Sequence, residues 1–123
     1  METSNLVRLE IWHKKYNLDK KDNLKEIPTE SAVFGIFGIV DEQPVNCRYV
    51  GETENLRETV VGLFENPREE GMGKFMQGSW VQMLVYETMP NSSKGDREKA
   101  AAGWKDNYGP KIGNDGEYPG YYD

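Results

Sequence analysis

The feature that most constrains the fold of this sequence is a pair of apolar runs separated by a short polar turn. The first run covers residues 32–40 and the second covers residues 45–51. Each run has the length of a β-strand, and the Asp-Glu-Gln-Pro sequence at residues 41–44 is a turn signal. Two strands joined by a short turn form a β-hairpin. The sequence therefore predicts an antiparallel hairpin against which the other elements must pack.

A helix is predicted directly after this hairpin. Thr53 can act as its N-cap, with the helix beginning near Glu54. Apolar residues then recur at helical spacing over residues 56–64, which gives the helix one apolar face. Pro67 ends the helix, because proline lacks the amide hydrogen that an interior helical position needs.

Three further segments complete the predicted set of elements. Residues 69–78 hold three glycines and are predicted to form a loop. Residues 79–88 are predicted to form a third strand, and residues 91–105 a second helix. The predicted fold is therefore α+β, with a small three-stranded antiparallel sheet flanked by helices.

The N-terminal segment fits two patterns. Residues 7–11 alternate between apolar and charged side chains, which is typical of a half-buried strand. Leu9, Trp12 and Tyr16 also share one helical face, with Ser4 available as an N-cap. The helix is the preferred prediction for this segment, and the strand is the alternative.

The predicted organisation is an N-terminal extension at residues 1–30, a domain at residues 31–115 and a tyrosine-rich tail at residues 116–123. A chain of 123 residues suits one domain with a modest core. The tail has two interpretations. It frays as chain ends commonly do, or it docks on a partner or across the chain's own cleft, because tyrosines supply contact area at small entropic cost.

Composition limits the kinds of site and the cellular location. No apolar run approaches the roughly 20 residues that a membrane span needs, and residues 1–5 lack the basic and apolar regions of a signal peptide. We therefore expect a cytoplasmic protein with no membrane partner. The single cysteine, Cys47, is expected to be buried in a strand. The single histidine, His13, is expected on a solvated face, and this pair argues against a dedicated zinc site.

The net charge of −6 is unevenly distributed. Residues 1–30 hold six basic and six acidic side chains, whereas residues 31–123 hold nine basic and fifteen acidic ones. Phosphate contacts from lysine and arginine supply most non-specific affinity for nucleic acid. An acidic balance therefore disfavours tight binding to DNA or RNA without excluding a local basic patch.

The two predicted strands carry a pair of motifs. Residues 35–37 read Gly-Ile-Phe and residues 49–51 read Tyr-Val-Gly, and residues 52–56 continue with Glu-Thr-Glu-Asn-Leu. Together with Glu98 and Asn114 farther along the chain, this order is similar to the GIY-YIG nuclease family over about two thirds of the sequence. The resemblance identifies residues 31–115 with that family's domain.

The resemblance implies a chemistry for five positions. It implies that Glu98 holds a divalent metal, Mg²⁺ or Mn²⁺, and that Asn114, Tyr49 of the second motif and a tyrosine of the first motif belong to the catalytic set. It also implies that a helix arginine steadies the scissile phosphate while the metal acts as a Lewis acid. Here the tyrosine of the first motif is replaced by Phe37, which lacks a hydroxyl, and the arginine position is occupied by Thr59.

Neighbouring arginines are not expected to replace the missing one. Arg57 precedes Thr59 by two residues, which is about 200° of rotation on a helix. Arg48 adjoins Tyr49, and adjacent strand residues are expected to point to opposite faces of a sheet. A working nuclease would therefore need a cation from elsewhere, such as Arg68 or Lys74.

Two function classes follow from these observations. The preferred hypothesis is a binding or regulatory module with a degenerate active site, which has a protein partner or associates with itself. The alternative is a divalent-metal-dependent DNA endonuclease, which would retain Tyr49, Glu98 and Asn114. A third hypothesis is an accessory protein whose acidic surface sequesters a basic partner.

Overall fold

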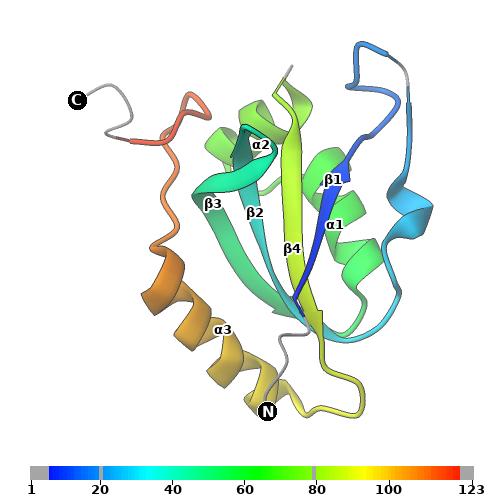
Figure 1. Cartoon of the computed structure of the whole chain (residues 1–123), viewed down its shortest axis with the longest axis vertical. Coiled ribbons are helices and arrows are strands. Elements are labelled where there is room, and N and C mark those ends of the chain that lie inside the picture. The colour runs from blue at the N-terminus through cyan, green and yellow to red at the C-terminus, as the bar shows by residue number, and fades with distance from the viewer. Residues whose placement is uncertain (1–5, 20, 79, 120–123) are drawn as a thin grey trace.

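The computed structural model describes residues 6–19, 21–78 and 80–119. Within these residues, four strands form one antiparallel sheet, as Figure 1 shows. Their order across the sheet is β1-β4-β2-β3. The strands are β1 (Val7–Ile11), β2 (Ala32–Val40), β3 (Gln43–Thr53) and β4 (Gln82–Thr88).

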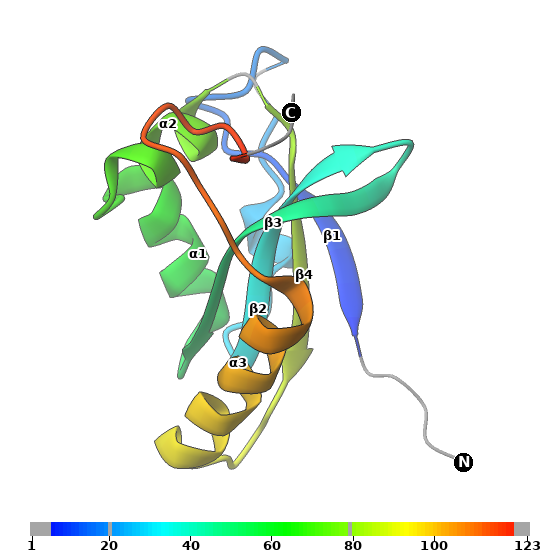
Figure 2. The same cartoon turned by 90° about the vertical axis from the view of Figure 1, so that its left-hand side faces the viewer.

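Helices lie on both sides of this sheet. Helices α1 (Leu56–Glu65) and α2 (Glu70–Gln77) lie together on one side, and α3 (Lys94–Tyr108) lies apart from them, near β3 and β2 (Figure 2). A short 3₁₀-helix, η1 (Leu24–Glu26), packs near α1. The α+β class predicted from the sequence is therefore confirmed, but the sheet has four strands rather than three.

Alternation along β2 produces two apolar cores. Phe34 and Ile36 belong to a core shared with α1 and α2, whereas Val33 and Phe37 belong to a second core that includes Ala101 of α3. Successive side chains of a strand point to opposite faces, so a central strand contributes to both. We call these two sides of the sheet the α1/α2 face and the α3 face.

The β2–β3 hairpin confirms the first prediction from the sequence. Its two turn residues, Asp41 and Glu42, have φ values of 51° and 66°. This left-handed pair is typical of the tight hairpin turn whose twist matches that of the flanking strands. Pro44 follows in β3, so the turn is shorter than the four residues expected.

The predicted helices at residues 54–66 and 91–105 are present as α1 and α3, and the strand at residues 79–88 as β4. Asn55 caps α1 in place of Thr53, and its side chain accepts the Glu58 amide at 3.0 Å. Ser93 and Asp96 form a reciprocal capping box at the start of α3.

The loop predicted at residues 69–78 is wrong, because α2 occupies most of that segment. Its Met72, Phe75 and Met76 recur at helical spacing and are almost fully buried. Burial of this face outweighs the low helix propensity of glycine. Gly71 is also required by packing, since a Cβ there would overlap the carbonyl oxygen of Gly113.

The helix preferred for the N-terminal segment is also wrong, and the strand alternative is the observed one. Val7 to Ile11 pair with β4, with Leu9 opposite Leu84. Leu9 and Ile11 face the core beneath α1 and α2. Pairing with the open edge of β4 supplies backbone hydrogen bonds that an isolated amphipathic pattern does not reveal.

His13, expected on a solvated face, is 8% exposed. Its Nε2 lies 2.9 Å from Oε2 of Glu65 at the end of α1, and its ring contacts those of Tyr16 and Phe64. The segment after β1 is therefore attached to α1 rather than extended into solvent.

Asn23 closes the outer edge of β1. Its Oδ1 accepts the Trp12 amide at 2.8 Å, and its Nδ2 donates to the Glu10 carbonyl at 2.6 Å. Asn23→Ala removes both bonds and leaves two backbone groups without these partners. We expect it to lower the free energy of unfolding by about 1 to 3 kcal/mol in urea denaturation.

Asn17→Ala is the matched control for this substitution. Asn17 makes one exposed hydrogen bond to the Asp19 amide, so we expect a change within about 0.5 kcal/mol. Equal effects of the two substitutions would contradict the edge-closing role of Asn23.

Candidate functional site

The hairpin strand β3 is irregular where it enters the candidate site. Ile36 pairs with Tyr49 and Phe37 with Cys47, so the register passes over Arg48. A residue without a partner in the ladder is a β-bulge, which bends the strand and redirects side chains. As a result the Arg48 guanidinium lies 4.1 Å from the ring centre of Phe75, on the α1/α2 face.

This geometry corrects the expectation that Arg48 and Tyr49 point to opposite faces. Tyr49 packs against the same core, with its ring 5.7 Å from that of Phe34. Arg48 is nevertheless held away from Tyr49, because it is buried and its Nε donates to the Gly116 carbonyl at 3.1 Å. It stabilises the segment after α3 rather than supplying a free cation.

Tyr49 lines a cavity of about 390 Å³ between β3, α1 and the turn into α2. Thr59 of α1 lines the same cavity, so the structure brings these two predicted positions together. The other side chains around it mix apolar groups with both signs of charge: Leu63, Asn66, Arg68, Glu69 and Met72.

The environment of Tyr49 favours its protonated form. Burial raises the pKa of the Tyr49 phenol above its ordinary value of 10.0, and Glu69 and Glu52 raise it further, while Arg68 lowers it. At neutral pH the hydroxyl is therefore a hydrogen-bond donor or acceptor, not a phenolate that could take a proton.

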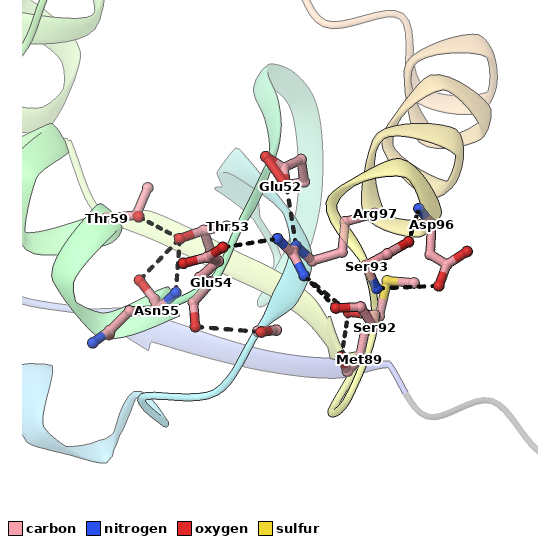
Figure 3. A network of polar contacts seen from close by, with 11 residues as sticks. Glu52, Thr53, Glu54, Asn55, Thr59, Met89, Ser92, Ser93, Asp96 and Arg97 are labelled. Carbon is pink, nitrogen blue, oxygen red and sulfur yellow. Dashed lines mark hydrogen bonds and ion pairs between the residues drawn. The ribbon is translucent and has the colours of Figure 1, made fainter.

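Thr59 is engaged in the local structure of the helix start. Its Oγ1 lies 2.6 Å from Oγ1 of Thr53, which in turn accepts the Asn55 amide at 3.0 Å, as Figure 3 shows. Thr59, which occupies the position of the expected arginine, therefore links the first turn of α1 to the end of β3 by a hydrogen bond.

The neighbouring cations differ in their access to the cavity. Arg57 turns to the N-terminal segment, where its side chain donates to the carbonyls of Ile27 and Lys25 at 2.8 and 2.7 Å. This agrees with the prediction that Arg57 does not replace the helix arginine. Arg68 is exposed and lines the Tyr49 cavity. Lys74 pairs with Glu70 at 3.3 Å on the surface of α2.

The three other predicted positions do not line the Tyr49 cavity. Phe37 lies on the α3 face, with its ring perpendicular to that of Tyr108 at 5.3 Å. Glu98 is exposed on α3. Asn114 is exposed in the segment after α3, next to the Gly113 that packs against α2.

The residue that the sequence did not single out is Arg97. It is 2% exposed, and its Nε lies 3.0 Å from Oε1 of Glu52 while its Nη2 lies 3.7 Å from Oε1 of Glu54. Its Nη1 donates to the carbonyl and hydroxyl of Ser92 at 2.8 and 3.2 Å. Figure 3 shows this network joining α3 to the end of β3.

A signal for this network was present in the sequence. Arg97 lies in the first turns of a helix, where a cation is disfavoured by the helix dipole unless an anion compensates it. The acidic side chains of Glu52 and Glu54 supply that compensation. Their charge is therefore partly neutralised within the domain.

The residues available for a metal are limited. Among the described residues there is no group of three or more His, Cys, Asp or Glu side chains placed to hold an ion. Glu98 offers one exposed carboxylate. Mg²⁺ held by one carboxylate takes its other ligands from water and substrate phosphates, so these residues alone do not form a complete cage.

Cys47 is buried in β3, as predicted. Burial raises the pKa of its thiol from 9.0 to about 11, which keeps it protonated and unreactive at neutral pH. It packs on the α3 face beside Phe37 and belongs to the core rather than to the candidate site.

Comparison with known proteins adds no assignment. No protein-family model, no curated protein and no solved structure matches the chain. Within the part of the chain that the structure describes, no helix combines the length and apolar character needed to cross a bilayer.

Stability at high pH provides a test of the Tyr49 environment. In the unfolded chain this phenol ionises near 10.0, whereas its folded pKa is higher. Its contribution to stability is therefore complete below pH 10 and is lost as pH rises toward the folded pKa. We expect Tyr49→Phe to lose less unfolding free energy than the wild type above pH 10. Parallel pH profiles of the two proteins would contradict the raised pKa.

Arg97→Met tests the network between α3 and β3. The substitution keeps the alkyl volume but leaves Glu52 and the Ser92 carbonyl without their partner, so we expect a loss of about 2 to 3 kcal/mol in unfolding free energy. Arg8→Ala is the control, since Arg8 makes a single exposed bond to Gln43, and its effect should stay within about 0.5 kcal/mol. A comparable loss in both variants would rule out a special role for Arg97.

Proposed function

We propose that this chain is a GIY-YIG-like domain with a degenerate active site, which acts as a non-catalytic or weakly catalytic binding or regulatory module. Support for the resemblance comes from the order of elements. A β2–β3 hairpin that carries both motifs leads directly into α1, and Glu98 lies on a later helix after another strand of the same sheet.

The observation that carries the proposal is the separation of the two motif positions. Tyr49 faces the α1/α2 side, and Phe37 faces α3, where it is packed edge-on against Tyr108. Two groups on opposite faces of a sheet do not flank the same phosphate. This arrangement, together with the missing hydroxyl of Phe37, favours a role in which the scaffold is used for contact and not for cleavage.

The surroundings of Thr59 favour the same conclusion. Its hydroxyl is bonded to Thr53, so the position contributes to the helix start and presents no cation to a ligand. Removing one transition-state donor typically lowers the rate of a nuclease-type reaction by about 10²- to 10³-fold.

The Tyr49 cavity suits a polar group of a protein partner. It combines a phenol hydroxyl with Arg68, Glu69 and the Asn66 amide, and its volume is about 390 Å³. The net charge of −6 favours a partner that is not a nucleic acid. Binding to another protein or self-association is therefore the proposed use of this face.

One observation favours the alternative, a divalent-metal-dependent endonuclease. Arg68 lies close enough to Tyr49 to lower the phenol's pKa, and it lines the same cavity. An exposed guanidinium beside this tyrosine could steady a phosphate in place of the residue missing at Thr59. Glu98, the residue that the resemblance assigns to Mg²⁺ or Mn²⁺, does not line this cavity, so the alternative has the weaker support.

Cleavage assays distinguish the two functions. Plasmid, branched DNA and RNA are incubated with the full chain in Mg²⁺ or Mn²⁺, beside the Glu98→Ala and Arg68→Ala variants. We expect no specific cleavage by the wild type, and no difference between the wild type and either variant. Gel analysis of the products over time provides the measurement.

Asp106→Ala is the matched control, because it removes another exposed carboxylate from α3. Specific cutting that disappears in Glu98→Ala and Arg68→Ala but persists in Asp106→Ala would establish the endonuclease and end the binding-module proposal.

A further inference from the structure

Arg48 lines a different cavity from the one beside Tyr49, with a volume of about 390 Å³. This cavity lies at one end of the sheet, where the turn of the β2–β3 hairpin, the start of β4, α2 and the segment after α3 meet (Figure 1). We call it the Arg48 cavity. No described residue lines both cavities, so a ligand here does not depend on the function proposed for the Tyr49 cavity.

The buried arginines of the described chain differ in what neutralises them. Arg97 is 2% exposed and has the carboxylates of Glu52 and Glu54 at 3.0 and 3.7 Å. Arg48 is 7% exposed, yet no carboxylate of a described residue lies within ion-pair distance of it. Arginine is almost never buried without a partner of opposite charge. An anion is therefore missing beside Arg48.

Two of the three guanidinium nitrogens of Arg48 are engaged by the backbone. Nε donates to the Gly116 carbonyl at 3.1 Å, and Nη1 donates to the Asn46 carbonyl at 3.3 Å. The described residues supply no acceptor for Nη2, and no side-chain nitrogen among them is buried without a partner. Nη2 is therefore the nitrogen that can donate to a ligand in the cavity.

Three features of the local backbone hold the guanidinium at the cavity. The β-bulge turns Arg48 toward it, and Asn46, which also lines it, has a φ of 53°. A left-handed conformation is costly for a residue other than glycine, and such residues cluster at ligand sites. Gly38 is the third feature, because a Cβ there would lie 2.8 Å from Nη1 of Arg48.

The charges around the Arg48 cavity restrict its ligand. Among the described residues, the charged side chains that line it are Arg48, Glu10 and Glu117. Burial lowers the pKa of the Arg48 guanidinium, and Glu117 raises it, so these two groups are neighbours. A simple anion would meet two carboxylates, and a simple cation would meet a buried guanidinium. A ligand that carries one charge of each sign meets a group of opposite charge at both ends.

The remaining walls of the cavity are mostly apolar. They consist of Ile39, Val40, Val45, Phe75, Trp80 and Val81, together with Asn46 and the backbone of Gly38. Small-molecule sites usually measure about 300–1,000 Å³ and combine apolar walls with a few polar groups. A volume of about 390 Å³ lies at the small end of this range. The ligand is therefore a small zwitterion with an apolar portion.

We propose that the Arg48 cavity binds a free α-amino acid with an apolar side chain, such as leucine, methionine or phenylalanine. The ligand carboxylate accepts from Nη2 of Arg48. Its ammonium group lies against the carboxylates of Glu10 and Glu117, and its side chain packs against Trp80 and Val81.

Side-chain signals in a proton–nitrogen NMR spectrum of the full chain test this proposal. The Nε–H of Arg48 and the indole of Trp80 are reporters, because both residues line the cavity. Arg97 and Trp104 provide matched controls outside it. We expect leucine, methionine and phenylalanine to shift the two reporters saturably, with a Kd of about 1 mM or below, and to leave the two controls in place. The absence of saturable shifts with all three amino acids would overturn the proposal.

Three analogues of leucine separate the contributions of its parts. Isocaproate lacks the ammonium group, isopentylamine lacks the carboxylate, and glycine lacks the apolar side chain. We expect each to bind at least about tenfold more weakly than leucine, since each loses a charge-assisted hydrogen bond or a buried apolar group. Isopentylamine binding as tightly as leucine would mean that the cavity accepts a cation alone, such as the amino terminus of a peptide, and would refute an amino-acid site.

A double variant, Glu10→Gln with Glu117→Gln, tests the ammonium end of the site. We expect the preference for leucine over isocaproate to disappear, a ratio that a purely structural role of these glutamates would not change. Glu87→Gln is the matched control, because Glu87 is a half-buried carboxylate outside the cavity, and it should keep the full preference. A preference that persists in the double variant, or that Glu87→Gln also abolishes, would sink the inference.

Discussion

Strand β2 is buried on both of its faces, and the rest of the molecule follows from this constraint. Residues 32–37 are all buried, and they alternate between the α1/α2 core and the α3 core. A strand in this position needs a paired strand on each edge, because its buried backbone N–H and C=O groups require hydrogen-bond partners. It also needs an element packed on each face, because its apolar side chains are stabilised by removal from water. β3 and β4 supply the edges, while α1, α2 and α3 supply the covers.

Polar contacts then fix the helices to the end of β3. The Thr53–Thr59 pair holds the start of α1, and the Arg97–Glu52 pair holds α3. Both contacts involve adjacent residues of β3, Glu52 and Thr53. β3 therefore positions α1 and α3 relative to each other. The same arrangement determines what the candidate site can offer: a Tyr49 hydroxyl kept protonated by burial, with an exposed arginine at the rim of its cavity.

Most local elements could be predicted from the sequence, because their signals are short-range. The turn between the apolar runs, the apolar spacing of α1, the capping residues of α3 and the burial of Cys47 each depend on neighbours in the chain. The failures have a common cause. The glycines of α2 suggested a loop, and the helical spacing of Leu9, Trp12 and Tyr16 suggested a helix. Packing against distant residues such as Gly113 and Leu84 decided both segments instead.

The candidate site also has features that the sequence determined and features that only the tertiary structure decided. The sequence by itself determined the hairpin, the helix that follows it and the residue types at the motif positions, including the absence of a hydroxyl at Phe37 and of a cation at Thr59. Only the tertiary structure decided which of those side chains meet. The bulge at Arg48 turned that arginine onto the α1/α2 face, strand alternation placed Phe37 on the other side, and the turn into α2 brought Arg68 beside Tyr49. These side-chain positions depend on strand register and on long-range packing, which cannot be read from the local pattern of residues.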